Sequence, residues 1–203
     1  MSVNVVVPLK ARRGKTRLMG VLAEDTRSRL IGAMLAQVCA ALGAAGIQAV
    51  SILTSDADWV PSGCEHIADA GLDLNAALAA AARQLTDAGA SSLLILAADL
   101  PFVTPADIAA LIEAGESRPV VIAPDVARSG TNALLLAPPL LLAPHFGTGS
   151  FAAHTRAART AGFEARIVQR DGLAQDIDTP EDLRGLVRAE AAAYDFLRSA
   201  LRA

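Results

Sequence analysis

The sequence predicts a three-layer α/β fold with a mostly parallel central sheet. Short apolar segments rich in β-branched residues alternate along the 203 residues with longer Ala- and Leu-rich segments of helical spacing. One short segment, residues 92–97, is apolar almost throughout, as expected for a strand that helices cover on both faces. Strands and helices that alternate in this way form βαβ units, whose strands run parallel.

The first elements follow from these patterns. A buried strand is predicted over residues 3–7, a helix over 24–42 and a second strand over 48–54. The next helix, over 75–88, ends at Gly89, because glycine is favoured at the first position past a helix.

The second half continues the alternation. After the strand over 92–97, a helix begins with Thr104 as its N-cap and Pro105 at its first position. The remaining elements are strands over 119–123 and 133–137, a helix over 150–161, an extended segment over 165–169 and a final helix over 179–201. We expect a single domain over residues 1–203.

Composition excludes several classes of function. The net charge is −3 and aromatic residues make up 3%, so no nucleic-acid partner is expected. Cys39 and Cys64 form no CxxC pair, which argues against a zinc site or a disulfide framework. Residues 30–55 carry no charge, but Gly43 and Gly46 divide them into a helix and a strand, so no membrane contact is expected. This use of Cys39 and Cys64 predicts a protein of the reducing cytoplasm, and the first residues lack the order of a signal peptide.

The informative residues follow the strands, because ligands of open α/β sheets bind beyond the carboxyl ends of the strands. The first such loop carries the basic residues Lys10, Arg12, Arg13, Lys15 and Arg17. Its GKT run is not a P-loop, since that motif requires glycine at position 9, where the chain has Leu9. A cationic loop at this place suits a polyphosphate, although its composition also fits a loop that only faces solvent.

Two aspartates, Asp99 and Asp178, are candidate metal ligands. Asp99 closely follows a buried strand, where a carboxylate is costly unless it is paired or bound to a metal. A helix start alone explains the segment around Asp178, but Thr179 can cap that helix, which leaves Asp176 and Asp178 without a structural task. Distant carboxylates that hold Mg²⁺ against substrate phosphates are the usual pattern for that ion, so Mg²⁺ is the predicted cofactor. Whether Asp176 or Asp178 is the second ligand stays open here.

Two loops rich in Gly, Ser and Thr could bind a phosphate. Residues 129–132 (SGTN) lie between two strands, and residues 146–150 (FGTGS) open a helix. Hydroxyls and free backbone N–H groups at a helix N-terminus suit an anion. A turn and a helix cap explain these loops equally well, and neither loop matches the GxGxxG pattern of dinucleotide-binding proteins. His154 could face the same site from the helix that follows.

In their order along the chain, these motifs resemble those of the phospholactate guanylyltransferases. The motifs are PLK, GKTRL, LDLNAAL, AADLP, SGTNALLL, HFGTGSFAAH and DIDTPEDL. The resemblance as a whole runs from about Val5 to Leu186. DLP and DTPEDL occur in many nucleotidyltransferases, whereas the SGTNALLL and HFGTGSFAAH pair is more specific. The resemblance implies the Rossmann-like sheet of the nucleotidyltransferases related to the molybdenum-cofactor transferases.

The resemblance also implies an activity and its residues. GMP would pass from GTP to the phosphate of 2-phospho-L-lactate, phosphoenolpyruvate or 3-phospho-D-glycerate, with release of pyrophosphate, in the biosynthesis of coenzyme F-420. Lys15 and Arg17 would hold the triphosphate. The other implied contacts are Asp99 and Asp178 with Mg²⁺, Pro8, Leu9 and Asn75 with the nucleotide, and Thr131, Gly147 and Ser150 with the acceptor phosphate.

Two other functions stay open on the sequence. A nucleotidyltransferase for a pterin cofactor or a sugar phosphate would share the fold, but the FGTGS loop crowds its acceptor side with a small-anion site. A module that senses nucleotides without catalysis would gain little from a metal poised for reaction. Apolar tail residues, Tyr194, Phe196 and Leu197, could serve a homodimer.

Overall fold

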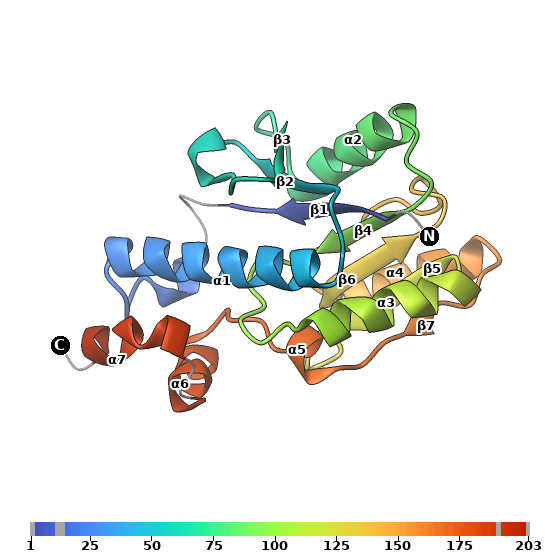
Figure 1. Ribbon diagram of the computed structural model, residues 1–203. Coiled ribbons are helices and arrows are strands. Elements are labelled where there is room, and N and C mark those ends of the chain that lie inside the picture. The colour runs from blue at the N-terminus through green and yellow to red at the C-terminus, as the bar shows by residue number, and fades with distance from the viewer. Residues whose placement is uncertain (1–2, 11–14, 190–191, 202–203) are drawn as a thin grey trace.

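A seven-stranded sheet forms the centre of the computed structural model, which describes residues 3–10, 15–189 and 192–201 (Figure 1). The strands are β1 (Asn4–Pro8), β2 (Val50–Thr54), β3 (Glu65–Ala68), β4 (Leu93–Leu96), β5 (Val120–Pro124), β6 (Thr131–Leu136) and β7 (Arg166–Ile167). Their order in the sheet is β3-β2-β1-β4-β6-β5-β7. Neighbouring strands are parallel except at β6, which is antiparallel to both β4 and β5. The predicted mostly parallel sheet is confirmed.

Helices cover both faces of the sheet and give the predicted three layers (Figure 1). These helices are α1 (Glu24–Ala44), α2 (Leu74–Asp87), α3 (Pro105–Ser117) and α4 (Ser150–Thr160). Val5 and Val7 of β1 pack in the core beneath α1 and α3, whereas Val6 packs in the opposite core with α2 and α4. Successive strand residues point to opposite faces, so an apolar run feeds both cores at once.

Local signals fix the helix ends as predicted. Thr104 caps α3, and its side chain and that of Asp107 form a capping box with each other's backbone N–H. Gly89 follows α2 with φ 93°, in the left-handed region that glycine adopts without steric cost. Among the described residues, no helix is both long and apolar enough to cross a membrane.

The antiparallel strand decides what meets at the ligand edge. The carboxyl ends of β1 and β4 lie at one edge because these neighbours are parallel. β6 brings its amino end to that same edge, since it runs antiparallel to β4 with Leu96 opposite Ala133. Asp99, shortly after β4, and Thr131, the first residue of β6, therefore lie at this same edge of the sheet.

The end of the chain corrects the sequence prediction. In place of one helix over residues 179–201, the structure has α6 (Pro180–Arg188), a 3-10 turn (Ala192–Tyr194) and α7 (Phe196–Ala200). A continuous helix of that length would extend about 34 Å. The break instead lets the second part of the tail pack beside α1 (Figure 1).

Apolar tail residues are used within the chain. Tyr194 and Leu197 are 3% and 0% exposed and pack with Met34 of α1 in a separate small core. The guanidinium of Arg29 lies 4.2 Å from the ring centroid of Phe196. The sequence allows these tail residues to serve a homodimer, but Tyr194 and Leu197 are buried within the chain and so could not contact a partner in this conformation.

Two elements escape the sequence patterns. Only Ile67 of β3 is buried, so this strand lacks the apolar run by which the others are predicted. α5 (Asp171–Ala174) is a single turn, too short to show helical periodicity.

Candidate active site

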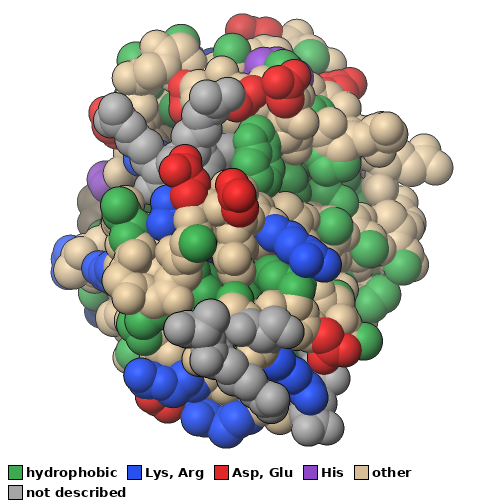
Figure 2. Space-filling model, turned by 90° about the vertical axis from the view of Figure 1, so that its left-hand side faces the viewer, with side chains coloured by type: hydrophobic (Ala, Val, Ile, Leu, Met, Phe, Trp, Pro, Cys, Tyr) green, Lys and Arg blue, Asp and Glu red, His purple; other side chains and the backbone are tan. Residues whose placement is uncertain are grey.

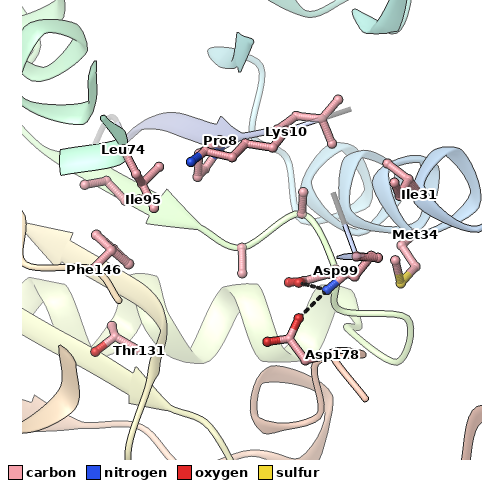
Figure 3. Close-up of a pocket in the computed structure, with 14 residues that line it drawn as sticks. Pro8, Lys10, Ile31, Met34, Leu74, Ile95, Asp99, Thr131, Phe146 and Asp178 are labelled. Atoms are coloured by element: carbon pink, nitrogen blue, oxygen red, sulfur yellow. Dashed lines mark hydrogen bonds and ion pairs between the residues drawn. The ribbon is translucent and has the colours of Figure 1, made fainter. Parts of the chain in front are cut away.

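A cavity of about 340 Å³ opens at the carboxyl edge of β1 and β4 (Figure 3). Apolar side chains, including Ile31 of α1 and Leu74 of α2, form one part of its wall. Lys15, Asp99 and Asp178 form another part. A pocket with a large apolar surface and a few converging charges suits a ligand that has both kinds of group.

Three of the four predicted nucleotide contacts, Pro8, Leu9 and Lys15, line this cavity, whereas Asn75 is not among its lining residues. A contact of these residues with a nucleotide stays a prediction. Arg12 and Arg13 of the basic loop lie outside the described residues. Figure 2 shows the face of the molecule at this end of the strands, where acidic, basic and hydrophobic side chains lie next to one another.

Lys15 is held by two carboxylates from distant parts of the chain (Figure 3). Its Nζ is ion-paired with Asp99 and, at 2.8 Å, with Oδ1 of Asp178. Burial lowers the pKa of Lys15, but the charges of Asp99 and Asp178 outweigh it, so the net pKa is raised and the amine stays protonated. Arg17, whose side chain is 71% exposed, reaches the other oxygen of Asp178 at 3.7 Å.

The backbone of Lys15 is unusual. Its φ of 57° and ψ of 40° lie in the left-handed region, which costs a non-glycine residue about 1–2 kcal/mol. Such a conformation persists where the surrounding contacts outweigh the strain, and such sites are commonly functional. The two carboxylates supply those contacts, since they hold a side chain that is only 8% exposed.

A third carboxylate, Asp176, completes the group. One oxygen from each of Asp99, Asp176 and Asp178 lies within 4.8 Å of the others. Asn132 donates from Nδ2 to Asp176 at 3.3 Å and to the carbonyl of Leu173 at 3.0 Å, which holds this segment against β6. The structure thus brings both Asp176 and Asp178 within reach of Asp99. Because carboxylate oxygens are suitable ligands, the three residues could hold a divalent metal ion.

The start of α6 fixes the backbone of Asp178. Thr179 and Asp182 form the predicted capping box. Asp182 also accepts a hydrogen bond from the backbone N–H of Asp178 at 3.0 Å. The capping residues thus leave the side chain of Asp178, 48% exposed, available to Lys15.

The loop before α4 differs from the sequence expectation. Gly149, with φ 74°, is the N-cap, and Ser150 is the first residue of the helix, so Ser150 does not cap it. The backbone N–H of Ser150 donates to the carbonyl of Gly147 at 3.1 Å, and that of Phe151 donates to the carbonyl of Ser129 at 3.2 Å. These two N–H groups are occupied, which corrects the expectation that they are free for an anion.

The predicted acceptor contacts lie close together, but only one lines the cavity. Thr131 is part of the cavity wall, as is Phe146, which directly precedes Gly147. Neither Gly147 nor Ser150 is among the lining residues. Ser150 lies one turn before His154 on α4, and His154 is hydrogen-bonded to Thr131 at 3.0 Å. A contact of Gly147 or Ser150 with an acceptor stays a prediction.

Comparison with known proteins bears out the resemblance. The family described as guanylyl transferase CofC like matches residues 3–202. The chain belongs to this family. It is 44% identical over 200 residues to the phosphoenolpyruvate guanylyltransferase of Rubrobacter xylanophilus, across 96% of this chain and 98% of that relative. It is 39% identical over 196 residues to the phosphoenolpyruvate guanylyltransferase of Sphaerobacter thermophilus, across 92% of this chain and 93% of that relative.

Solved structures agree on the fold of this CofC-like chain. A candidate nucleotide-diphospho-sugar transferase from Desulfovibrio desulfuricans G20 matches with a TM-score of 0.83 at 18% identity, over 99% of this chain and 97% of that one. A CMP:2-keto-3-deoxy-manno-octonic acid synthetase complexed with CTP matches with a TM-score of 0.61 at 16% identity, over 94% of this chain and 100% of that one. The family and the two relatives make this chain an enzyme, a guanylyltransferase rather than a sensor module. The solved structures show that it has the Rossmann-like nucleotidyltransferase fold.

In this CofC-like chain, Asn75 has a task that the sequence does not show. Its Nδ2 donates to the carbonyl of Phe146 at 3.0 Å, and its Oδ1 accepts from the N–H of Phe146 at 2.7 Å. The start of α2 thus clamps the loop that precedes α4. A contact of Asn75 with the nucleotide stays a prediction, and the second N–H of its amide or the remaining lone pair of Oδ1 would make that contact.

Sequence reasoning gave Asn132 no role and left open whether Asp176 is a metal ligand. Both lie beside predicted residues, within the SGTN and DIDTPEDL motifs. Their positions next to predicted site residues could have indicated a role for each. Their hydrogen bond could not be predicted, because it joins positions far apart in the chain.

We expect Asp176→Asn to stabilise the metal-free protein at neutral pH. Burial, and then the charge of Asp99, raises the pKa of Asp176 to about 6, above the value of an unfolded aspartate. The folded state therefore binds more protons between about pH 4 and pH 6, and this group's contribution to stability declines as pH rises through that window. With a chelator present, the free energy of unfolding of Asp176→Asn should exceed that of the wild type by about 1–2 kcal/mol at pH 7. Urea unfolding at pH 4 and pH 7 measures this difference, which should nearly vanish at pH 4.

The control for this prediction is Asp87→Asn, an exposed aspartate at the far end of α2. As an exposed substitution away from the site, it should change the unfolding free energy by no more than about 0.5 kcal/mol. A pH-independent difference for Asp176→Asn would contradict the prediction.

Proposed function

We propose that this guanylyltransferase transfers GMP from GTP to the phosphate of a phosphorylated three-carbon acid and releases pyrophosphate. The observation that carries the proposal is the cluster of Lys15, Asp99 and Asp178 at one end of a cavity that is otherwise largely apolar. The charged end suits a triphosphate, and the apolar end suits a base.

The names of the relatives favour phosphoenolpyruvate as the acceptor. 2-Phospho-L-lactate and 3-phospho-D-glycerate are the other acceptors that fit the same chemistry. Each product would have a diphosphate bridge and serve the biosynthesis of coenzyme F-420. In a single nucleotidyltransferase domain of this size, nucleotide and acceptor would share the one sheet edge where the polar residues gather.

Mg²⁺ is the proposed metal, with Asp99 and Asp178 as ligands and Asp176 as a third. Carboxylate oxygens are the donors that this hard ion prefers. Lys15 lies between two of these carboxylates, so a positive charge is already stabilised at this place. When bound, the ion would offset the negative charge that develops on the phosphate oxygens.

The residues of the chain would act by alignment and charge neutralisation. A phosphate monoester is already ionised at neutral pH, so an oxygen of the acceptor can attack the α-phosphorus of GTP without a general base. The bond from that phosphorus to the oxygen that bridges to the β-phosphate breaks, and pyrophosphate leaves with the electron pair. Lys15 and Arg17 would neutralise the triphosphate, while Thr131 and Ser150 would orient the acceptor.

Pyrophosphate release tests this proposal in one matrix. ATP, CTP, GTP and UTP are each combined with each three-carbon acid, and with a sugar phosphate and a phosphorylated pterin as further arms. We expect turnover with GTP and a three-carbon acid, and loss of turnover on chelation. Turnover confined to the sugar-phosphate or pterin arms would contradict the proposal.

Ser150→Ala should lower kcat/KM for the acceptor about ten- to hundredfold. A hydrogen bond to a charged group contributes about 1.5–3 kcal/mol, and about 1.4 kcal/mol corresponds to a factor of ten. Gly149 rather than Ser150 caps α4, so the substitution should leave stability nearly unchanged. Thr131→Val should act in the same way, because it removes a hydroxyl and keeps the side-chain volume. Separate titrations of acceptor and GTP measure both effects, and GTP binding should barely change.

Thr155→Val provides the matched control. It removes a hydroxyl from the same helix, and that hydroxyl donates to the carbonyl of Phe151 at 2.8 Å. Its acceptor kinetics should stay close to the wild type. Equal losses for acceptor and GTP in Ser150→Ala, or lost stability with normal kinetics, would assign this loop a structural role.

A further inference from the structure

His154 is a buried polar side chain for which the proposed reaction has no role so far. It lies in α4 and is 0% exposed. Its Nε2 is 2.9 Å from the backbone nitrogen of His145, and its Nδ1 is 3.0 Å from the hydroxyl oxygen of Thr131. The ring of Phe146 packs edge-on against it, with 4.9 Å between the centroids. His154 thus joins the loop before α4 to the first residue of β6.

The contact with His145 decides which nitrogen of His154 carries the proton. A backbone N–H can only donate, so Nε2 must accept with its lone pair. Burial, with a smaller effect of His145, lowers the pKa of His154 to about 4, so the ring is neutral at neutral pH. A neutral ring with a lone pair on Nε2 carries its hydrogen on Nδ1, and that N–H donates to Thr131.

The hydroxyl of Thr131 is thereby given a direction. Because its oxygen accepts from His154, its own hydrogen does not point at the ring. No other hydrogen bond of this hydroxyl occurs with the residues that the structure describes, and Thr131 lines the cavity. With the opposite tautomer, Thr131 would use its only hydrogen on Nδ1 and present lone pairs alone, which repel an anion.

We propose that His154 is a positioning residue that makes Thr131 a hydrogen-bond donor to an anionic oxygen of the acceptor. A phosphate or carboxylate oxygen accepts such a bond and gains more from it than a neutral group does. The nature of the acceptor rests on the proposed function, whereas the tautomer of His154 is a property of the free protein.

Two amide variants separate the two contacts of His154. The side chain of His154→Gln reaches the position of Nε2, where its oxygen can accept from His145, but Thr131 loses its donor. The side chain of His154→Asn ends near the position of Nδ1, where its N–H can donate to Thr131, but the contact with His145 is lost. We expect His154→Gln to lower kcat/KM for phosphoenolpyruvate about tenfold, with unchanged Kd for GTP, and His154→Asn to retain more activity.

The reverse order of the two variants would show that His154 only anchors the loop, and it would overturn the proposal. His66→Gln is the matched control, since His66 lies on β3 and bonds the carbonyl of Thr54 away from the acceptor side. Its kinetics should stay within about twofold of the wild type.

A double-mutant cycle of His154 and Thr131 distinguishes the proposed role of His154 from a purely structural one. In the Thr131→Val background, His154→Gln should lower kcat/KM hardly further, because its effect passes through the missing hydroxyl. Full additivity of the two losses would overturn the proposal.

Long-range ¹⁵N–¹H NMR of the full-length wild type measures the tautomer without turnover. The His154 signals are assigned by their loss in His154→Gln. We expect a protonated Nδ1 and a lone pair on Nε2. A protonated Nε2 would overturn the inference whatever the acceptor is, whereas a lack of turnover with every three-carbon acid would contradict only the proposed function.

Discussion

Asp99→Asn should lower turnover by about 100-fold or more and leave the fold intact. Asp99 follows the fully buried strand β4, pairs with Lys15 and lies within 4.8 Å of the oxygens of Asp176 and Asp178. Asparagine has the same shape but lacks the charge that would attract a cation. The measurement is kcat at saturating GTP and acceptor over a range of Mg²⁺ concentrations, with circular dichroism to verify folding.

Loss of a metal ligand predicts a second change in the same experiment. Asp99→Asn should need more Mg²⁺ for half-maximal activity, because one of three converging carboxylates has become neutral. Asp87→Asn on α2 removes a charge far from the cavity and should show neither effect. A folded Asp99→Asn with normal turnover and normal Mg²⁺ dependence would remove Asp99 from the metal site.

Lys15→Ala should lower kcat/KM by about 100-fold or more for every nucleoside triphosphate alike. The Nζ of Lys15 is bound by Asp99 and Asp178, at the charged end of the cavity, so it would act on phosphate charge rather than on the base. The order of preference among ATP, CTP, GTP and UTP should therefore be unchanged. Initial rates with all four nucleotides at one acceptor concentration measure both quantities.

Removal of Lys15 also leaves two carboxylates facing each other without their shared cation. Added Mg²⁺ should consequently raise the melting temperature of Lys15→Ala more than that of the wild type. The chain's other lysine, Lys10, lines the same cavity but is exposed, so Lys10→Ala should show a smaller kinetic loss. A Lys15→Ala enzyme that merely exchanged GTP for another nucleotide would contradict the assignment.

Much of the fold is predictable because its strands are buried on both faces. Runs such as Leu93–Leu96 have no polar residue, and short local signals such as Thr104 and Gly89 mark the helix ends. β3 escapes because three of its four residues are exposed. The end of the helix after α6 could not be predicted, because the helical periodicity of the sequence continues past it. It is the packing of the following residues against α1 that requires the chain to turn there.

The site is predictable where strand ends determine it and not where side chains pair at long range. Asp99 and Asp178 come together because the segments that carry them reach one edge of the sheet. The insertion of Lys15 between them depends on a left-handed backbone that no local pattern indicates at this position. The clamp of Asn75 on Phe146 and the hydrogen bond from Asn132 to Asp176 join positions 71 and 44 residues apart. Ser150 lies one residue past the capping position, which Gly149 occupies. In a loop with several small and hydroxyl residues, the sequence does not show which of them is the N-cap.

The pairing of β4 with β6 sets a fixed separation between Asp99 and Thr131. Asp99 follows one strand and Thr131 begins the other, and the two strands are hydrogen-bonded through Ile95 opposite Leu134. A one-residue slip would turn every side chain of the strand to the opposite face, so this register cannot drift. In the proposed reaction, with the nucleotide at Asp99 and the acceptor at Thr131, the sheet would hold the two substrates at a fixed separation. If the acceptor binds as proposed, a longer or bulkier carbon skeleton would need more space beside wall side chains such as Phe146. Substitutions of Phe146 would then be expected to change acceptor choice.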